Sequence, residues 1–441
     1  MLESYLFSLT YLVFPIVIFS AYRKLGLSFR EVSITNAVIL SLLIFSYVGI
    51  LPLYFYWDAY RYNIGVVDRT IILYIFFASF WAILSITLVF WVLRSVFPVP
   101  RRRVPAFNNS RSLTRLEVSL STLIFMACVG VFLIYINSVN NVALFVAIFG
   151  GEQSIAAARS SMTNAYEGNY HWYRFFINDV AIFISYCFYA NHLMKKSIVS
   201  RLMFFITFVG SCVFLLASAQ KAPIIWYFLG LYLVYAIVMN EGHVHVKGTF
   251  FLILLGFSAL IALYMVFMGV DAFFDAMKSI FSRAFAAGIS ASYFYFEFFP
   301  AHKDYLLGSS LPNPGGIFPF EPYQLTKELM AWRFPQDAER GVVGSSPTVF
   351  WGEAYANFSW IGIFFVPILM GMVIYCYHFL VYYLENTPFK VGLIAWLVIF
   401  FRYVASTGFS SFVVNLTFFC FLVFVVVLIF ISSRLRFKVI Y

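Results

Sequence analysis

Charged side chains are scarce in this chain of 441 residues: only 11% are Asp, Glu, Lys or Arg, whereas 63% are hydrophobic. A water-soluble domain carries about 25% charged residues and roughly half apolar ones. A soluble fold of this length has too little interior to hide so much apolar surface. The composition therefore excludes a soluble globular protein and predicts that lipid surrounds most of the chain.

Motifs for metals and nucleotides are lacking as well. The five cysteines fall inside apolar runs with no CxxC spacing, at Cys128, Cys187, Cys212, Cys376 and Cys420. The chain has no Walker A loop, no HExxH and no Rossmann or kinase fingerprint. It also lacks an early pair of acidic residues of the kind that metal-dependent membrane glycosyltransferases use. We therefore expect no disulfide, no metal and no cofactor.

Long apolar runs fill most of the sequence. A helix needs about 20 apolar residues to cross a hydrocarbon core about 30 Å thick. Continuous runs favour helices over a β-barrel, whose strands alternate. The sequence thus predicts an all-α polytopic membrane protein, with a single transmembrane domain over residues 1–441 and about eleven spans, at roughly 4–21, 36–56, 71–94, 118–137, 173–193, 202–219, 222–240, 249–269, 359–383, 390–406 and 411–432.

Positive charge sets the expected orientation. The net charge of +10 comes mainly from short loops in one alternating set, such as the one that holds Arg101, Arg102 and Arg103. The positive-inside rule assigns this set to the cytoplasm, with the N-terminus outside and the C-terminus cytoplasmic. Two long loops, 138–172 and 270–358, then lie on the outer face. We expect function in the second, because long loops on compact proteins commonly carry it.

Some basic residues are not explained by this orientation. Lys221 and Arg174 begin helices that run inward from the outer face, where a cation opposes the helix dipole unless an anion is bound. Arg402 lies inside a predicted span near its outer end, where a charge is expensive and usually functional. Long basic side chains that reach lipid phosphates at the interface are the alternative. Taken together, outer cations beside helix N-termini suit a pyrophosphate.

The stretch from Gly344 to Phe358 is the most informative in the chain. Ser346 fits an N-cap with Pro347 at the first helical position. The helix then carries Glu353 and Asn357 on one face, one turn apart. A carboxylate that enters a span is a candidate general base or an ion-pair partner for the outer cations. His302 is a second candidate base, with simple solvation in a loop as its alternative.

Aromatic residues make up 22% of the chain, and most are expected in lipid-facing packing and interface belts. Those in the predicted outer loops are candidates to stack on sugar rings. They are Tyr170, Trp172, Trp332 and Trp351.

Three stretches resemble the O-antigen and oligosaccharide repeat-unit polymerases of the Wzy type. They are Ser218-Ala-Gln-Lys221, the Pro-rich segment 311–322, and Ser346-Pro347-Thr348 followed by Gly352-Glu353-Ala-Tyr355-x-Asn357-Phe358 and Gly362. The chain departs from the family in having Lys221 where an Arg is frequent. The Arg-x10-Gly spacing of some members fits Arg333 to Gly344 but not Arg159 to Gly168.

The resemblance implies a GT-C-like polymerase or ligase architecture in the bacterial inner membrane and a metal-independent glycosyl transfer on the periplasmic face. The donor would be the growing glycan on undecaprenyl pyrophosphate, and the acceptor a hydroxyl of a fresh lipid-linked unit. Cations would stabilise the departing pyrophosphate. Partners would be these lipid-linked oligosaccharides, the lipid bilayer and a chain-length regulator, with no nucleic acid. The residues implied are Glu353 and His302 as bases, Arg159, Arg174, Lys221, Arg283, Arg333 and Arg402 around the pyrophosphate, and Tyr170, Trp172, Trp351, Tyr355 and Asn357 around the sugars.

Three other functions stay open at the level of sequence. An O-antigen ligase shares the architecture and the donor but transfers finished chains to another acceptor. A flippase or transporter for the same lipid-linked sugar would show related halves and charged or broken helices at the membrane midplane. A membrane O-acyltransferase would need a histidine deep in a span, and none of the six histidines fits this position well.

Overall fold

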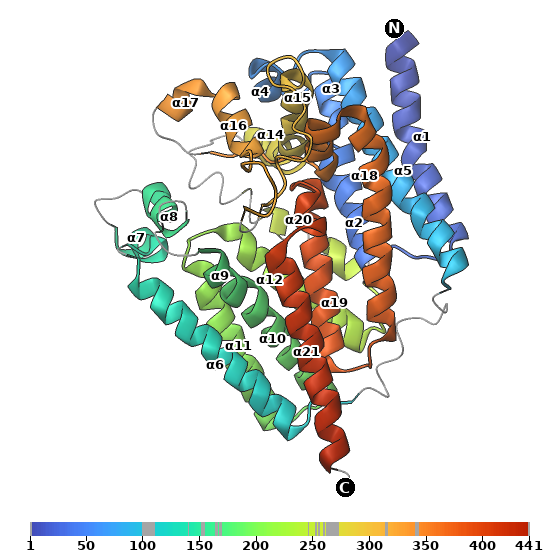
Figure 1. Cartoon of the computed structure of the whole chain (residues 1–441). Helices are drawn as coiled ribbons and strands as arrows, with labels where there is room; N and C mark the ends of the chain where they lie inside the picture. The colour runs from blue at the N-terminus through green and yellow to red at the C-terminus, as the bar shows by residue number, and fades with distance from the viewer. Residues whose placement is uncertain are drawn as a thin grey trace. The chain divides into compact units, whose positions relative to one another are not determined.

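The computed structural model describes the chain apart from residues 1, 99–110, 140, 151–154, 164–165, 167–169, 246, 252–253, 255, 259–260, 262–272, 314–315, 340–343 and 440–441. The part described is mostly α-helical and contains no β-strand (Figure 1). Within it, nine helices are long and apolar enough to cross a membrane. The prediction of an all-α, multi-pass membrane protein is therefore confirmed, whereas orientation and the number of spans stay predictions.

The nine helices match nine of the predicted spans. They are Leu2–Lys24 (α1), Ile34–Tyr54 (α2 Ile34–Leu42, π-helical η1 Leu43–Tyr47 and α3 Ile50–Tyr54), Arg69–Val96 (α5), Arg115–Asn137 (α6), Ile198–Leu216 (α11), Ala222–Met239 (within α12, Lys221–Met239), Phe350–Tyr383 (α18), Pro388–Ala405 (α19 Pro388–Phe401 and the 3-10 turn η6 Arg402–Ala405) and Ser410–Ile431 (α20 Ser410–Val413 and most of α21, Leu416–Val439).

Two predicted spans are not among the nine. The run 173–193 corresponds to the helices Tyr170–Arg174 (α9) and Ala181–Met194 (α10), joined by the π-helical segment Phe175–Val180 (η3). This run is not among the nine helices that are long and apolar enough to cross a membrane, so its role as a span stays a prediction. The run 249–269 lies largely outside the described residues.

The chain divides into two compact units. Unit 1 comprises Met1–Arg101, His245–Tyr382 and Phe401–Asn415, and unit 2 comprises Arg102–Val244, Tyr383–Phe400 and Leu416–Tyr441. Each unit therefore combines segments that are far apart in the sequence. The predicted loop 270–358 belongs entirely to unit 1, and the predicted loop 138–172 belongs to unit 2.

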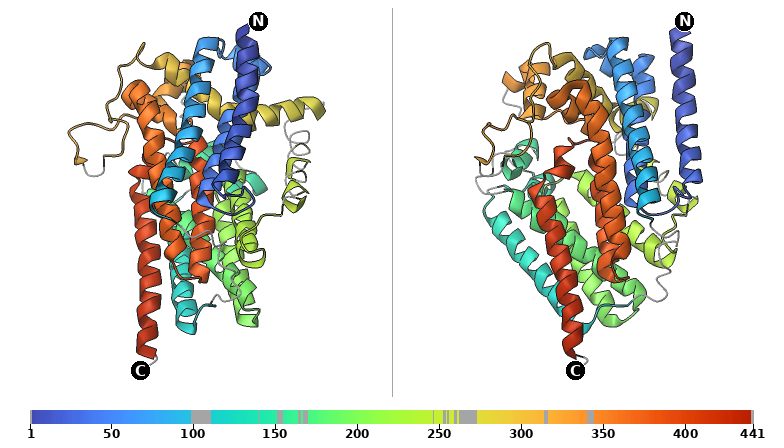
Figure 2. Two further views of the ribbon diagram at one scale, coloured as in Figure 1. Left: turned by 90° about the vertical axis from the view of Figure 1, so that its right-hand side faces the viewer. Right: turned by 45° about the vertical axis from the view of Figure 1, so that its right-hand side comes forward.

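Helix α5 packs against several other elements of unit 1. Asp68 caps its start by accepting the N–H of Thr70 at 2.7 Å, as short polar side chains do before a helix. The helix packs against α1, α3 and Ala287–Phe298 (α15), and Figure 2 shows α1 beside it. It also touches α18 closely, because a Cβ added at Gly371 would lie 2.9 Å from the Cβ of Val89. Glycine is thus required where these two helices meet.

The loop 270–358 folds into short helices of unit 1. They are Phe273–Phe281 (α14), the π-helical Ser282–Ala286 (η4), α15, Leu325–Arg333 (α16) and Pro335–Glu339 (α17). Helix α15 packs against η1, α3, α5 and α16, so this loop rests on the spanning helices of its own unit. The aromatic residues of α15 account for this contact, since Tyr293, Phe294, Tyr295 and Phe296 are all buried.

Unit 2 is held together by α10. This helix packs against α6, α11 and α12, and the π segment η3 contacts α6, α11 and α21. Aromatic stacking joins α19 to α21, where the rings of Trp396 and Phe421 lie 3.8 Å apart. The two shorter helices Ala143–Phe149 (α7) and Ile155–Thr163 (α8) pack on each other.

Candidate functional site

The segment that leads into α18 differs from its prediction. Ser346 and Pro347 do not start the helix, which begins at Phe350. Instead, the segment before it is tied to α15: the Ser346 carbonyl accepts the Tyr295 hydroxyl at 3.1 Å, and the Thr348 hydroxyl donates to the Gly288 carbonyl at 3.1 Å. Pairing with α15 thus replaces the expected local N-cap. Tertiary hydrogen bonds override this local signal.

Glu353 lies in the first turns of α18 and is buried, with 7% of its surface exposed. Its carboxylate accepts three hydrogen bonds: from the Ser410 N–H and hydroxyl, both at 2.9 Å, and from the Ser310 hydroxyl at 3.0 Å. Gly408 leaves room for this group, because a Cβ there would lie 2.1 Å from Oε2. The carboxylate therefore joins α18 to the start of α20 and to the loop around Ser310.

Asn357 completes the same network and is fully buried. Its amide donates to the Ser310 hydroxyl at 2.7 Å and to the Glu353 carbonyl at 2.8 Å, and its oxygen accepts the Gly308 N–H at 3.0 Å. The Leu306 N–H adds a hydrogen bond of 3.0 Å to the Ala356 carbonyl. We call Glu353, Asn357, Ser310 and Ser410 the α18 polar network.

This network has a clear chemical consequence. All three donors to the Glu353 carboxylate come from the protein itself. For Glu353 to act as a general base, a substrate hydroxyl would have to take the place of the Ser310 or Ser410 hydroxyl, because a base must reach the proton it removes. Its role as base stays a prediction. In this conformation the side chain holds the segment around Ser310 on the helix.

The predicted sugar-binding aromatics on α18 are covered. Trp351 has no exposed surface, and its ring lies 6.1 Å from that of Phe296. Tyr355 is buried and donates its hydroxyl to the Phe299 carbonyl at 3.1 Å. Neither ring offers a face to solvent here, so stacking on a sugar would need the surrounding helices to open. Their predicted role is untested.

A second cluster in unit 1 joins α15 to α16. Arg333, at the end of α16, places its guanidinium 4.6 Å from the ring centre of Phe294. The same group covers Gly65, where a Cβ would lie 2.6 Å from Nη2. His302 is exposed, with its ring 5.0 Å from that of Trp332. Two residues with predicted roles, Arg333 and His302, thus belong to one cluster.

Glu297 belongs to this cluster and was not predicted. It is the one charged residue of α15, and its Oε2 is buried without a hydrogen-bond partner. Burial raises the pKa of Glu297, while Arg333 and His302 nearby lower it and Asp68 raises it further. The signal was present in the sequence as a lone carboxylate in the aromatic run 293–299. We call Glu297, His302, Trp332 and Arg333 the α15–α16 cluster.

Arg283 is exposed in η4, next to a tie between η4 and Ala59–Asn63 (α4). Ser282 donates to Asp58 at 2.5 Å, and Asp58 caps α4 by accepting the Arg61 N–H at 3.1 Å. Burial lowers the pKa of the Arg61 guanidinium, Asp58 raises it, and Arg283 lowers it again. Two guanidiniums therefore lie close together here, and the sequence analysis had singled out only Arg283.

Arg402, the third predicted cation of unit 1, is 8% exposed. Its guanidinium stacks 3.7 Å from the ring centre of Tyr403. The short helix η6 that carries it packs against α2. A buried arginine inside a predicted span agrees with the expectation that such charges face protein rather than lipid.

The other predicted residues lie in unit 2. Arg159, on α8, donates to the Ala219 carbonyl, and its Nε is buried without a partner. Arg174 ends α9, which also carries Tyr170 and the exposed Trp172. Lys221 begins α12 as predicted, and its side chain lies outside the described part. The six cations of the predicted pyrophosphate cradle are thus divided equally between the units, and the cradle stays a prediction.

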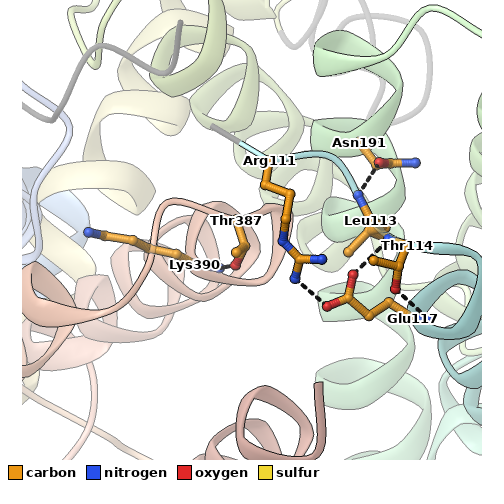
Figure 3. A network of polar contacts seen from close by, with 7 residues as sticks. All are labelled: Arg111, Leu113, Thr114, Glu117, Asn191, Thr387 and Lys390. Carbon is orange, nitrogen blue, oxygen red and sulfur yellow. Dashed lines mark hydrogen bonds and ion pairs between the residues drawn. The ribbon is translucent and has the colours of Figure 1, made fainter. Parts of the chain in front are cut away.

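A further polar network in unit 2 fixes the start of α6 (Figure 3). Thr114 and Glu117 form a capping box, and Glu117 also pairs with Arg111. The Leu113 N–H donates to Asn191 on α10 at 2.9 Å. Because Glu117 is buried with all of these partners in place, we interpret the network as structural. It lies on the side of α6 for which the sequence predicts a cytoplasmic position.

In the described part of the chain, no three His, Cys, Asp or Glu side chains lie close enough to share a metal ion. Comparisons with protein-family models, with curated proteins and with solved structures give no match.

Proposed function

We propose that this protein is a glycosyltransferase of the bacterial inner membrane that polymerises undecaprenyl-pyrophosphate-linked oligosaccharide repeat units on the periplasmic face. One observation carries the proposal: the predicted outer loop 270–358 folds onto spanning helices of its own unit and brings two carboxylates, a histidine and an arginine together there. Acid–base groups gathered in one place suit a transfer in which a sugar hydroxyl is held and loses a proton. The resemblance of the three sequence stretches supports the same reading.

In the proposed reaction, the hydroxyl oxygen of a new repeat unit attacks the anomeric carbon at the end of the growing chain. The hydroxyl proton passes to a base, for which Glu353 and His302 are the candidates. The bond between the anomeric carbon and the pyrophosphate oxygen breaks, and its electron pair leaves with undecaprenyl pyrophosphate. Guanidinium groups stabilise this developing charge, as fixed positive groups do in other transfers of charged leaving groups.

A glycan ladder assay tests the proposal directly. The purified protein, in liposomes, receives synthetic polyprenyl-pyrophosphate repeat units and no nucleotide. Lipid-linked products that lengthen by one repeat unit at a time are the expected result. A protein with Lys327 replaced by Met serves as the control variant, because this side chain is exposed on α16 and has no proposed role.

Two other outcomes would replace the proposal. Faster exchange of lipid-linked sugar across the liposome membrane, without longer products, would identify a flippase. Transfer of a preassembled glycan to an added lipid acceptor, without a ladder, would identify a ligase. Each readout uses the same liposomes, so the three functions are separated in one preparation.

A further inference from the structure

Two polar atoms of the α15–α16 cluster are buried without hydrogen-bond partners. One is the carboxylate oxygen Oε2 of Glu297, and the other is Nε of Arg333. The two side chains interact electrostatically, yet they form no ion pair within 4.0 Å in the described part of the chain. An acceptor and a donor therefore lie near each other, and no protein group forms a hydrogen bond with either atom.

Burying two such polar atoms destabilises the protein unless each forms a hydrogen bond. A buried polar atom left unpaired loses its hydration without compensation. A hydroxyl group can donate one hydrogen bond and accept another, so a single hydroxyl satisfies a carboxylate and a guanidinium together. The guanidinium has little room to change its orientation. The ring centre of Phe294 lies 4.6 Å from it, and the backbone of Gly65 packs directly against Nη2.

The surroundings of the pair favour a carbohydrate over a phosphate. Asp68 is near enough to Glu297 to raise its pKa, so two carboxylates share this place with Arg333 and His302. A second negative charge nearby repels an anion. Trp332 and His302 supply rings beside the charged groups, and aromatic rings accept the apolar faces of sugars while charged groups bind their hydroxyls.

We propose that Glu297 and Arg333 bind one hydroxyl group of a saccharide, with Trp332 and His302 beside the sugar ring. The proposal rests on the proposed polymerase function and assigns this site to the acceptor repeat unit. It also moves Arg333 from the predicted pyrophosphate cradle to the sugar. Glu297 becomes the group that holds the hydroxyl and accepts a hydrogen bond from it.

Saturation-transfer NMR on the protein in nanodiscs tests the site with a panel of methyl glycosides of hexoses, hexosamines and uronic acids. We expect at least one glycoside to bind, and Glu297→Gln and Arg333→Met to weaken its binding by about tenfold, since each removes a hydrogen bond to a charged group. Glu328→Gln and Lys327→Met are matched controls, because both side chains are exposed on α16. They should bind as the unaltered protein does.

Loss of binding is evidence for the site only if the variant is folded. The thermal unfolding of each variant is therefore compared with that of the unaltered protein. Glu297→Asp provides a second variant. It keeps the negative charge, but its side chain is one methylene shorter, so the carboxylate lies farther from the bound hydroxyl. If no glycoside binds, or if binding is unchanged in both Glu297 variants, the two atoms share only a water molecule and the proposal is overturned.

The ladder assay separates this site from the proposed function. A ladder with an unchanged KM for the acceptor in Glu297→Gln would reject the site and keep the polymerase. Glycoside binding that depends on Glu297, in a protein that makes no ladder, would keep the site and reject the polymerase. An increased KM for the acceptor, with an unaltered KM for the donor, would support both.

Discussion

Asn357 donates a hydrogen bond of 2.7 Å to the hydroxyl of Ser310, and that hydroxyl in turn donates to Glu353 at 3.0 Å. One serine of the loop 270–358 is thus held between two side chains of α18. All three residues belong to unit 1, so the arrangement links a spanning helix to the loop 270–358 within one unit. This link adds to the packing of α15 in holding that loop in place.

In the α18 polar network, we expect the shape of the Glu353 side chain to matter more for stability than its charge. In Glu353→Gln, the amide can donate to the Ser310 and Ser410 hydroxyls and still accept the Ser410 N–H, so we expect a loss of stability below about 1 kcal/mol. Glu353→Ala leaves several buried groups unpaired and should cost about 3 kcal/mol or more. Thermal unfolding in detergent measures both.

The same two variants separate the roles of Glu353 in the reaction. If the carboxylate positions the loop, Glu353→Gln keeps most of the polymerising activity while Glu353→Ala loses it. If it removes the acceptor proton, Glu353→Gln is folded but inactive, because an amide is not a base at neutral pH. Full activity of both variants would contradict each role.

Helix α18 bends sharply at Ser359, which has φ 57° and ψ −148°. This region of backbone space is almost confined to glycine, and another residue there costs about 1–3 kcal/mol. We therefore expect Ser359→Gly to raise the stability by about 1 kcal/mol. Ser95→Gly, at an exposed helical position of α5, should instead lower it by roughly the usual penalty of about 0.5–1 kcal/mol. Equal effects of the two changes would argue against strain at Ser359.

The spans could be predicted because twenty apolar residues in a row have few other solutions in a membrane protein. The bend in α18 also falls where the sequence placed the start of a span, at residue 359. The prediction for Ser346 and Pro347 was wrong, since a local capping signal competes with tertiary partners that a sequence does not show. The run 173–193 was predicted as one span, and its π segment has no simple signature in the sequence.

The candidate site was predictable in part. Glu353 and Asn357 share a face of one helix, so their spacing alone indicated a common environment. Their partners Ser310 and Ser410 come from distant segments, and serines of this kind are too common to single out. Glu297 was missed because its neighbours Arg333 and His302 lie in other segments.

Helices α10 and α12 of unit 2 meet at Gly230. A Cβ added there would lie 1.9 Å from the hydroxyl oxygen of Tyr186, whose side chain is buried. Gly230→Ala should therefore cost about 1–3 kcal/mol by overpacking. Gly130→Ala in α6 is the control, because nothing lies within 4 Å of the added Cβ, and alanine is favoured in a helix by about 1 kcal/mol. Thermal unfolding of the two variants should shift in opposite directions.

The predicted orientation can be checked by labelling single cysteines. Leu307 lies in the loop 270–358 and is 80% exposed, whereas Ile198, within the positive segment 195–201, is 83% exposed. In a variant without the native cysteines, a membrane-impermeant maleimide added to intact cells with a permeable outer membrane should label Leu307→Cys. It should label Ile198→Cys only after the inner membrane is broken. The reverse pattern would invert the predicted topology.

The raised pKa of Glu297 predicts how stability changes with pH. Burial favours the protonated carboxyl, so the folded protein holds this proton at pH values where the unfolded chain, near its ordinary value of 4.5, has lost it. Stability from this group is therefore fully present below that value and is lost as the pH rises through the folded pKa. The charged groups that face Glu297 are Arg333 on α16, His302 in the following loop and Asp68 before α5, and Tyr293 is close by on α15.

Glu297→Gln should remove this contribution while keeping the shape of the side chain. We expect the difference in thermal transition between Glu297→Gln and the unaltered protein to grow in favour of the variant as the pH increases from about 4 to 7, because only the carboxyl pays for ionising in a buried place. Glu328→Gln, on the exposed side of α16, should show no such trend. If a saccharide hydroxyl binds the carboxylate as proposed, the added glycoside should reduce the difference at the higher pH, because it supplies the hydrogen bond that the ionised group lacks.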